Sequence, residues 1–448
     1  MDPKVSRGLR IGGAVLLVLV AAFAGWKLAG RGSRTARQTS PPPAQELVVE
    51  DLLSDLLVVD THIDLPTLLF EKGAHAEDVG QRTRQGQFDA VRARLGRLNI
   101  AWMSIYVPAD YQKGDGGKTF ADGLIDLVDA LPKRHPDLFA IPRSADEAEK
   151  IAREGKIALP LGMENGAGIE GDLGNLRHFY DRGIRYITLT HSEDNRLADS
   201  SFSDPAARHW HGLSPFGRRA IAEMNRLGIL VDVSHASDEA FDQALAASKA
   251  PPIASHSSCR YFTPGFERNL DDGRLRALAA KGGVVQINFG SAFLTPQANA
   301  WFVAFQKAEA AFVDRTKAKE GTVEIDEFRA DYQKRNPFPR ATLDDVVAHI
   351  EHAVQVAGID HVGLGSDFDG VEDTLPVGLE DVSKYPLLAA RLAARGFDRD
   401  QLAKVFGGNL MRVWREAERV ARENGGRAPE EEPSSAPDLA THAPSTGG

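Results

Sequence analysis

The chain has 448 residues, of which 42% are hydrophobic, and a formal net charge of −10 at pH 7. This length is too great for a small scaffold held together by disulfides, and it fits two ordinary domains or one large barrel. The negative balance argues against a general nucleic-acid-binding protein, which would carry a basic face. The single cysteine, Cys259, cannot form an internal disulfide.

The first 45 residues differ in charge and hydropathy from the rest. They carry seven Lys or Arg residues against one Asp, a net charge of +6, which leaves −16 for the rest of the chain. Residues 11–26 contain no charge and are flanked by Arg10 and Lys27. This pattern predicts either a single-pass membrane anchor, extended by snorkelling of the two cations, or a secretory signal with the small-residue site Ala22-Phe23-Ala24. Because the basic start favours a cytoplasmic N-terminus, we expect a cell-envelope protein with its main domain on the extracytoplasmic side, or one secreted after cleavage.

Composition divides the chain into three parts. Residues 1–45 hold the anchor or signal and a Pro-rich linker with three consecutive prolines at 41–43. Residues 425–448 are rich in Gly, Pro, Ser and Glu, which predicts a disordered tail. We therefore expect one folded domain at residues 46–424.

Eight short apolar runs occur along this domain, and helical patterns separate most of them. The runs are Leu57–Asp64, Ile100–Val107, Ile157–Glu164, Tyr186–His191, Leu230–His235, Pro252–His256, Val284–Phe289 and Val362–Asp367. Continuous apolar runs are typical of parallel strands buried on both faces. Segments such as Ser214–Leu227 and Asp271–Lys281 have helical spacing. The alternation predicts an α/β fold, a (β/α)₈ TIM-type barrel, with an open doubly wound sheet as the alternative.

The interval between the seventh and eighth runs is too long for a barrel connection. Residues 296–332 are charged and rich in Ala, and they predict extra helices. The sequence Asn336-Pro337-Phe338-Pro339 then interrupts the pattern before another helix at Leu343–Ala357. We expect a helical insertion before strand eight that covers the barrel mouth or forms an oligomer surface.

Polar residues gather at the ends of the predicted strands. They are His62, Asp64, Glu164, His191, His235, His256 and Asp367. In a parallel barrel these ends lie on one face, where barrel active sites are found. One His-x-Asp pattern is expected by chance in this composition, so the argument rests on the combination: four of the 13 histidines fall at the ends of four strands. Buried, unpaired imidazoles and carboxylates are costly, so metal ions are their natural partners.

The types of these residues fit zinc. Three imidazoles, one aspartate and one glutamate can serve two borderline metal ions. His62 and Asp64 are two residues apart on a strand, and therefore share a face. Glu164 can bridge two ions about 3.5–4 Å apart, a separation typical of hydrolytic sites that activate water for attack on a carbonyl or phosphoryl group.

Seven motifs, in order along the chain, resemble those of the membrane (renal-type) dipeptidase family of the amidohydrolase superfamily. They are VVDTHIDLP (58–66), GMENG (162–166), YITLTHSEDNRLAD (186–199), DVSHAS (232–237), SHSS (255–258), GLGSDFDG (363–370) and GLEDVSKYP (378–386). The resemblance runs from about Leu56 to Trp414 and implies a (β/α)₈ dipeptidase with two zinc ions. The matching motifs imply that His62 and Asp64 bind one zinc ion, that His235 and His256 bind a second, and that Glu164 bridges the two ions.

The same resemblance implies roles for three further residues. His191 would contact the substrate carbonyl, and Arg268, followed by Asn269, would hold the substrate carboxylate. Asp367 would shuttle a proton to the leaving amine, and strand direction favours it over Asp369 of the same motif. The implied substrates are dipeptides with free termini, extended to D-configured C-terminal residues, and a homodimer remains open. The alternatives are a metal-dependent hydrolase of another amide, ester or lactone, and a non-catalytic binding protein.

Four other residues that attract attention have simpler interpretations. We expect Trp102 and Tyr106 to pack within the barrel and not to stack on substrate. His349 and His352 lie on the predicted helix Leu343–Ala357, and we expect them to be packing or surface residues. Cys259 is interpreted as a small buried residue, because the metal ligands are already supplied.

Overall fold

The computed structural model describes residues 52–114, 116–318 and 322–424. The expected anchor or signal, the Pro-rich linker and the expected tail at 425–448 lie outside these described residues. Among the described helices, none combines the length and the apolar character needed to span a membrane.

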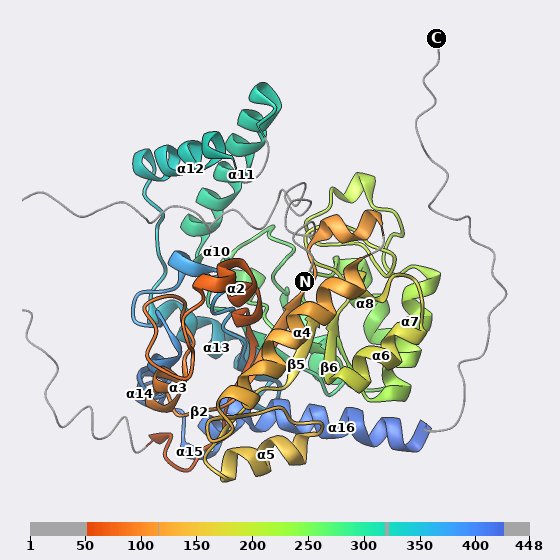
Figure 1. Ribbon diagram of the computed structural model, residues 1–448, viewed down its shortest axis with the longest axis vertical. Helices are drawn as coiled ribbons and strands as arrows, with labels where there is room; N and C mark the ends of the chain where they lie inside the picture. Colours follow the sequence, from red (N-terminus) through yellow and green to blue (C-terminus); the bar gives the residue numbers. More distant parts are fainter. Residues whose placement is uncertain (1–51, 115, 319–321, 425–448) are drawn as a thin grey trace, which may run out of the picture.

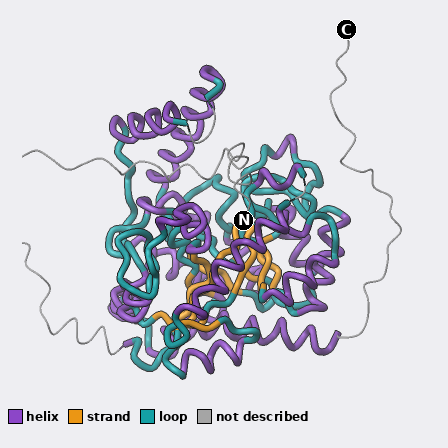
Figure 2. The backbone as a smooth tube through the Cα atoms, viewed as in Figure 1, coloured by secondary structure: helices purple, strands orange, loops and turns teal. Residues whose placement is uncertain are grey.

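The strands lie at the centre of the molecule, with helices around them (Figure 2). Eight of them are parallel and form a barrel. They are β1 (Val58–Ile63), β2 (Leu98–Tyr106), β5 (Leu161–Glu164), β6 (Ile184–Thr188), β7 (Leu230–Asp232), β8 (Ile253–Ala254), β9 (Val284–Ile287) and β10 (Val362–Leu364). Each pairs with the next in this order. The chain after β10 returns to β1 through a parallel bridge between Ile63 and Phe368. The predicted TIM-type barrel is therefore confirmed.

The third predicted strand is divided into two. Its first half, β4 (Ile157–Ala158), pairs with β2 and with the short β3 (Phe139–Ala140) outside the barrel order. Its second half is β5, which belongs to the barrel. Pro160 lies between the two halves, and proline has no N–H group for a ladder hydrogen bond.

Helices lie between the strands, and those expected at Ser214–Leu227 and Asp271–Lys281 occur within one residue of these bounds. In chain order they are α2 (Leu65–Lys72), α3 (Ala90–Leu95), α4 (Gly117–Arg134), α5 (Ala145–Arg153), α6 (Gly174–Arg182), α7 (Pro215–Leu227), α8 (Asp238–Ala247), α9 (Asp272–Ala280), α10 (Ser291–Leu294), α11 (Pro296–Thr316), α12 (Val323–Arg335), α13 (Leu343–Ala357), α14 (Tyr385–Ala394), α15 (Arg399–Ala403) and α16 (Asn409–Asn424). The Ser214 hydroxyl accepts from the Gly217 N–H at the start of α7, and Gly228 ends it at a φ of 82°. These caps satisfy backbone groups that the helix leaves unpaired.

The amino-terminal end of the barrel is closed by α16, which runs across the bottom of the molecule in Figure 1. Its buried residues join an apolar cluster with the first residues of several strands. The rings of Trp414 on α16 and Trp102 on β2 lie 4.8 Å apart, and both side chains are fully buried. The expected packing role of Trp102 is confirmed.

The predicted insertion is a pair of helices, α11 and α12, which stands out from the barrel body at the top of Figure 1. Aromatic rings hold the two helices together: Phe305 lies 5.1 Å from Tyr332, and Phe312 lies 4.5 Å from Phe328. Because the insertion follows the carboxyl end of β9, it emerges on the side of the barrel opposite α16.

Candidate metal centre and active site

Four histidines from four segments point their Nε2 atoms at one carboxylate. Glu164 ends β5, and its Oε1 lies 3.1 Å from His235, 3.2 Å from His256 and 3.5 Å from His191. Its Oε2 lies 3.5 Å from Nε2 of His62. All five side chains are buried. Residues far apart in the sequence therefore form one compact cluster at the carboxyl ends of the strands.

Two aspartates complete the cluster on the side of β1. Oδ2 of Asp64 lies 3.4 Å from Nε2 of His62, and the donor atoms of His62, Asp64 and Asp367 lie within 4.8 Å of one another. Two further groups of donor atoms within the same limit are His62 with Glu164 and His256, and Glu164 with His191 and His235. Every residue that the sequence predicts as a ligand thus lies in a group that can hold a metal ion.

The sequence had suggested that these side chains lie inside the strands. Most of them lie just beyond the strand ends instead. The observed strands β6, β7, β8 and β10 end two or three residues before His191, His235, His256 and Asp367. His235 and Asp367 have φ values of 64° and 65°, a left-handed conformation that does not occur in a strand. The predicted strand ends were therefore wrong, and the sharp turns place the side chains over the mouth.

Hydrogen bonds on the far side of two imidazoles determine which nitrogen faces Glu164. Tyr186 donates from its hydroxyl to the Thr61 carbonyl at 3.2 Å, so at 2.9 Å it accepts from Nδ1 of His62. Ser255 donates to Asp232 at 2.6 Å, and accepts from Nδ1 of His256 at 2.7 Å.

These bonds leave the Nε2 lone pair of each ring directed at the cluster. Nε2 of His62 has no hydrogen-bond partner among the described residues. Such imidazoles, held by an outer hydrogen bond and set beside carboxylates, match the donor set of a divalent metal site.

The protonation of part of the cluster fits the same interpretation. His62 differs, because, against the effect of burial, Tyr186, Asp64 and Glu164 raise its pKa well above the usual value. Burial, together with neighbouring positive charge, lowers the pKa of His235 and His256 well below the usual value. Although burial opposes it, the surrounding histidines bring the pKa of Glu164 well below its usual value. Neutral imidazoles beside an ionised carboxylate are the forms that bind a divalent cation.

Comparisons with known proteins agree with this geometry. A family model described as membrane dipeptidase (peptidase family M19) matches residues 47–427. The chain belongs to the membrane dipeptidase family. The uncharacterized dipeptidase C965.12 of Schizosaccharomyces pombe is 35% identical over 378 residues, which are 81% of each chain. The expected family and a dipeptidase activity are thereby confirmed, and the family is one of metallopeptidases.

Two solved structures resemble this dipeptidase over most of its length. The probable dipeptidase PvdM from Pseudomonas aeruginosa superposes with a TM-score of 0.72 at 29% identity, covering 85% of this chain and all of that one. A metallo peptidase from Rhodobacter sphaeroides, liganded with a phosphinate mimic of the dipeptide L-Ala-D-Ala, gives 0.65 at 25% identity and covers 81% and 99%.

Arg268 of the dipeptidase is a buried cation beside the cluster. Its Nη1 donates to the Ser257 hydroxyl and its Nη2 to the His256 carbonyl, both at 2.8 Å. Its Nε has no partner among the described residues. Burial lowers the pKa of Arg268 to about 10, so the guanidinium stays charged at neutral pH. The Arg268 side chain is therefore suited to bind an anionic group such as a carboxylate.

One residue at the site, Asn288, was missed in the sequence, and another, Tyr106, was assigned only to packing within the barrel. Asn288, just past β9, donates from Nδ2 to Oδ2 of Asp367 at 2.8 Å. Tyr106 ends β2 opposite Glu164, and its ring lies 4.6 Å from that of His191, so it faces the site and does not only pack within the barrel. Asn288 is a polar residue at the end of a predicted apolar run, the same signal that marks the other site residues.

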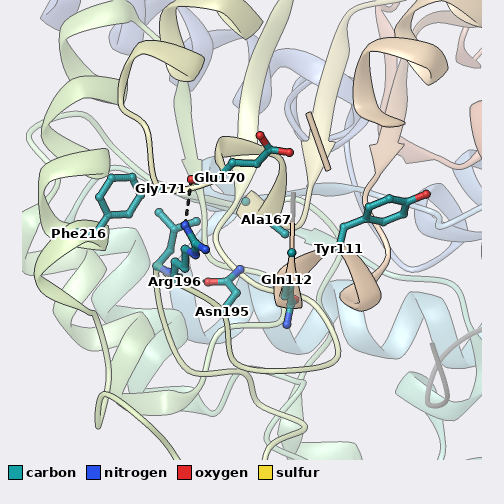
Figure 3. A pocket seen from close by; sticks show the side chains of 11 residues that line it. Tyr111, Gln112, Ala167, Glu170, Gly171, Asn195, Arg196 and Phe216 are labelled. Atoms are coloured by element: carbon teal, nitrogen blue, oxygen red, sulfur yellow. Dashed lines mark hydrogen bonds between the residues drawn. The ribbon is translucent and has the colours of Figure 1, made fainter. Parts of the chain in front are cut away.

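A small pocket lies beside the loops that follow β5 and β6 (Figure 3). Its volume is about 10 Å³, which is room for one water molecule and no substrate. Asn195 in its lining donates to Asn165 at 2.9 Å, and Asn165 donates to Gln112 at 2.9 Å. These bonds brace the two loops against each other.

Proposed function

We propose that this enzyme is a zinc-dependent dipeptidase that hydrolyses dipeptides with free amino and carboxyl termini. The observation that supports this proposal most strongly is the convergence of four buried Nε2 atoms on Glu164, with the buried cation Arg268 beside them. Imidazole and carboxylate donors favour zinc over the hard cations Mg²⁺ and Ca²⁺.

In this proposal two zinc ions share the cluster. His62 and Asp64 would hold one ion, His235 and His256 the other, and Glu164 would lie between them. Bound zinc would lower the pKa of a water molecule and polarise the substrate carbonyl.

The remaining side chains position the substrate and move a proton. Arg268 binds the free carboxylate of the substrate, which selects molecules of dipeptide length. His191 donates a hydrogen bond to the carbonyl oxygen as negative charge develops on it. Asp367, held at Oδ2 by Asn288, takes a proton from the attacking water at Oδ1 and returns it to the leaving amine.

The test is a substrate panel with zinc-loaded enzyme and its His62→Ala variant. The panel contains dipeptides, their C-terminally amidated forms, dipeptides with D-configured second residues, an N-acyl amino acid and a lactone. We expect turnover of free dipeptides only, and its loss in the variant. We include D-configured residues because the Rhodobacter sphaeroides relative is liganded with a mimic of L-Ala-D-Ala. Equal turnover of an amidated dipeptide would contradict the role of Arg268, and preference for the lactone would contradict the proposed substrate.

We also propose that the catalytic domain acts outside the cytoplasmic membrane. The uncharged run at residues 11–26 and its basic flanks support either an anchor or a cleaved signal. Fractionation of cells that express the full chain distinguishes the two: an anchored protein sediments with membranes, and a cleaved one is soluble and starts after residue 24.

A further inference from the structure

A row of aromatic rings connects the metal cluster to Arg268. The ring of Phe202 lies 5.9 Å from that of His235 and 6.1 Å from that of Phe266. Phe266 lies 5.8 Å from Phe293, and the guanidinium carbon of Arg268 lies 5.4 Å from the Phe293 ring. We call Phe202, Phe266 and Phe293 the aromatic wall.

The backbone ties Phe202 directly to the site. The Ser200 hydroxyl donates to the His191 carbonyl at 2.5 Å and accepts from the Phe202 N–H at 3.1 Å. The next N–H, that of Ser201, donates to the His235 carbonyl at 2.8 Å. Phe202 is therefore held between two residues of the cluster.

Phe266 lies in the loop before α9 and Phe293 lies on α10, and one residue, Asn269, joins them. The Asn269 side chain donates to the Phe293 carbonyl at 2.7 Å, while the Asn269 N–H donates to the Phe266 carbonyl at 3.1 Å. The wall is thus assembled from three segments, and its position is set before any ligand binds.

The wall is apolar, and the charged side chain nearest to it in sequence is neutralised elsewhere. Glu267, next to Phe266, pairs with Arg208 at 2.6 Å and accepts from the Asp238 N–H at 2.7 Å. Phe202 and Phe266 remain half-buried, whereas Phe293 is buried. Two aromatic faces are thus left with surface that a ligand side chain can cover.

We propose that the aromatic wall binds the side chain of the C-terminal residue of the substrate and makes the enzyme selective for large apolar residues there. The inference rests on the proposed function, which places the substrate carboxylate at Arg268 and the scissile carbonyl at the Glu164 cluster. One Cα atom separates that carboxylate from the scissile nitrogen, so its side chain leaves the backbone between these two points. The wall makes contact with His235 of the cluster at one end and with Arg268 at the other.

The experiment compares alanyl-phenylalanine and alanyl-leucine with alanyl-glycine and alanyl-aspartate. Its variants are Phe202→Ala and Phe266→Ala, with Phe202→Leu and Phe266→Leu as conservative partners in case truncation disturbs the loops. The matched control is Tyr261→Ala, which removes an aromatic ring from the same loop as Phe266 but from an exposed position stacked on His352.

We expect kcat/KM for alanyl-phenylalanine to exceed that for alanyl-glycine by about tenfold or more, as for one well-filled apolar pocket. Each alanine variant should lose most of this preference and leave alanyl-glycine turnover within about twofold of the wild type. The leucine variants should keep part of the preference, and Tyr261→Ala should keep all of it. Equal rates for the phenylalanine and glycine substrates, or an equal loss on both in the variants, would overturn the inference and leave the proposed function intact.

Equilibrium binding of phosphinate dipeptide mimics tests the aromatic wall independently of catalysis. We expect the mimic with a C-terminal phenylalanine side chain to bind about tenfold more tightly than its glycine counterpart, and Phe202→Ala to abolish the difference. This preference without hydrolysis of any dipeptide would support the wall and contradict the proposed function. Equal binding of both mimics would overturn the wall.

Discussion

At the scale of single residues, the orientation of two of the four imidazoles depends on hydrogen bonds made by their outer nitrogen. His62 is oriented by Tyr186, and His256 by Ser255 and Asp232. Without these partners a ring can rotate or carry its proton on Nε2, and the lone pair then no longer faces Glu164. The outer residues of a metal site accordingly contribute to metal affinity although they never touch the ion.

Replacing Tyr186 by Phe tests this dependence. The variant keeps the aromatic ring but removes the oxygen that accepts from Nδ1 of His62. We expect zinc affinity, measured by competition with a chromophoric chelator, to fall about 10- to 100-fold. Tyr106→Phe, which also removes one hydroxyl near the site, should leave the affinity unchanged. Equal affinities of wild type and Tyr186→Phe would show that the hydrogen bond does not orient the ring.

Replacing Asn288 by Ala tests the placement of Asp367. The change removes the hydrogen bond to Oδ2 and frees the carboxylate to rotate. Because general acid–base catalysis contributes roughly 10²–10⁴-fold, partial misplacement should lower kcat by about 10- to 100-fold with little change in KM. The Asp367→Asn variant shows how far kcat falls when the proton-transferring carboxylate is removed completely. A rise in KM at constant kcat would assign Asn288 to substrate binding instead.

At the scale of elements, one histidine joins α13 to the segments around the mouth. His349 accepts at Nδ1 from the Cys259 N–H at 3.0 Å and donates from Nε2 to the Leu294 carbonyl at 2.9 Å. Its side chain is fully buried, so the expected packing role is borne out. Only the neutral ring can make both bonds, because a protonated ring has no acceptor nitrogen.

This bonding predicts a pH-dependent contribution to stability. Burial lowers the pKa of His349 to about 4, from 6.5 in the unfolded chain. The folded state therefore disfavours the proton: the contribution is complete above pH 6.5 and is lost as the pH falls towards 4, a difference of roughly 3 kcal/mol. Urea unfolding at several pH values should give a shallower decline between pH 6.5 and 4 for His349→Gln than for wild type or His352→Gln. Parallel declines in all three would contradict the assignment.

At the scale of the whole molecule, stability and chemistry occupy opposite ends of the barrel. The amino-terminal end is closed by α16, whereas the metal cluster, Arg268 and the aromatic wall lie at the carboxyl end. This separation is general for barrel enzymes, whose catalytic loops vary on a conserved scaffold. A substitution that lowers stability at the amino-terminal end is therefore expected to leave metal binding and catalysis at the carboxyl end unchanged.

Trp414→Ala tests the separation. It empties a fully buried site beside Trp102, and should lower the free energy of unfolding by about 3–5 kcal/mol. Zinc affinity and kcat/KM of the folded enzyme should stay at wild-type values well below its melting temperature. Denaturant unfolding and steady-state kinetics on the same preparation measure both. A stable variant with reduced kcat/KM would show that the ends are coupled.

Much of the fold could be read from local patterns. Strands such as β1 within the run Leu57–Asp64 and helices such as Leu343–Ala357 occur where apolar spacing predicts them. The strand ends could not be read, because the left-handed turns at His235 and Asp367 arise from packing around the mouth and leave no mark in hydropathy. Tyr106 was assigned to the barrel interior for a similar reason: an aromatic residue ending a strand can face the core or the site.

By itself, the sequence determined the alternation of strands and helices, the insertion before the last strand, and the residue types at the strand ends. These follow from periodicity and polarity within short windows. Only the tertiary structure decided which imidazole nitrogen faces Glu164, that Asn288 holds Asp367, and that Phe202, Phe266 and Phe293 form one surface. Such contacts join segments dozens of residues apart, and they exist only once the barrel has closed and brought the carboxyl ends of its strands together.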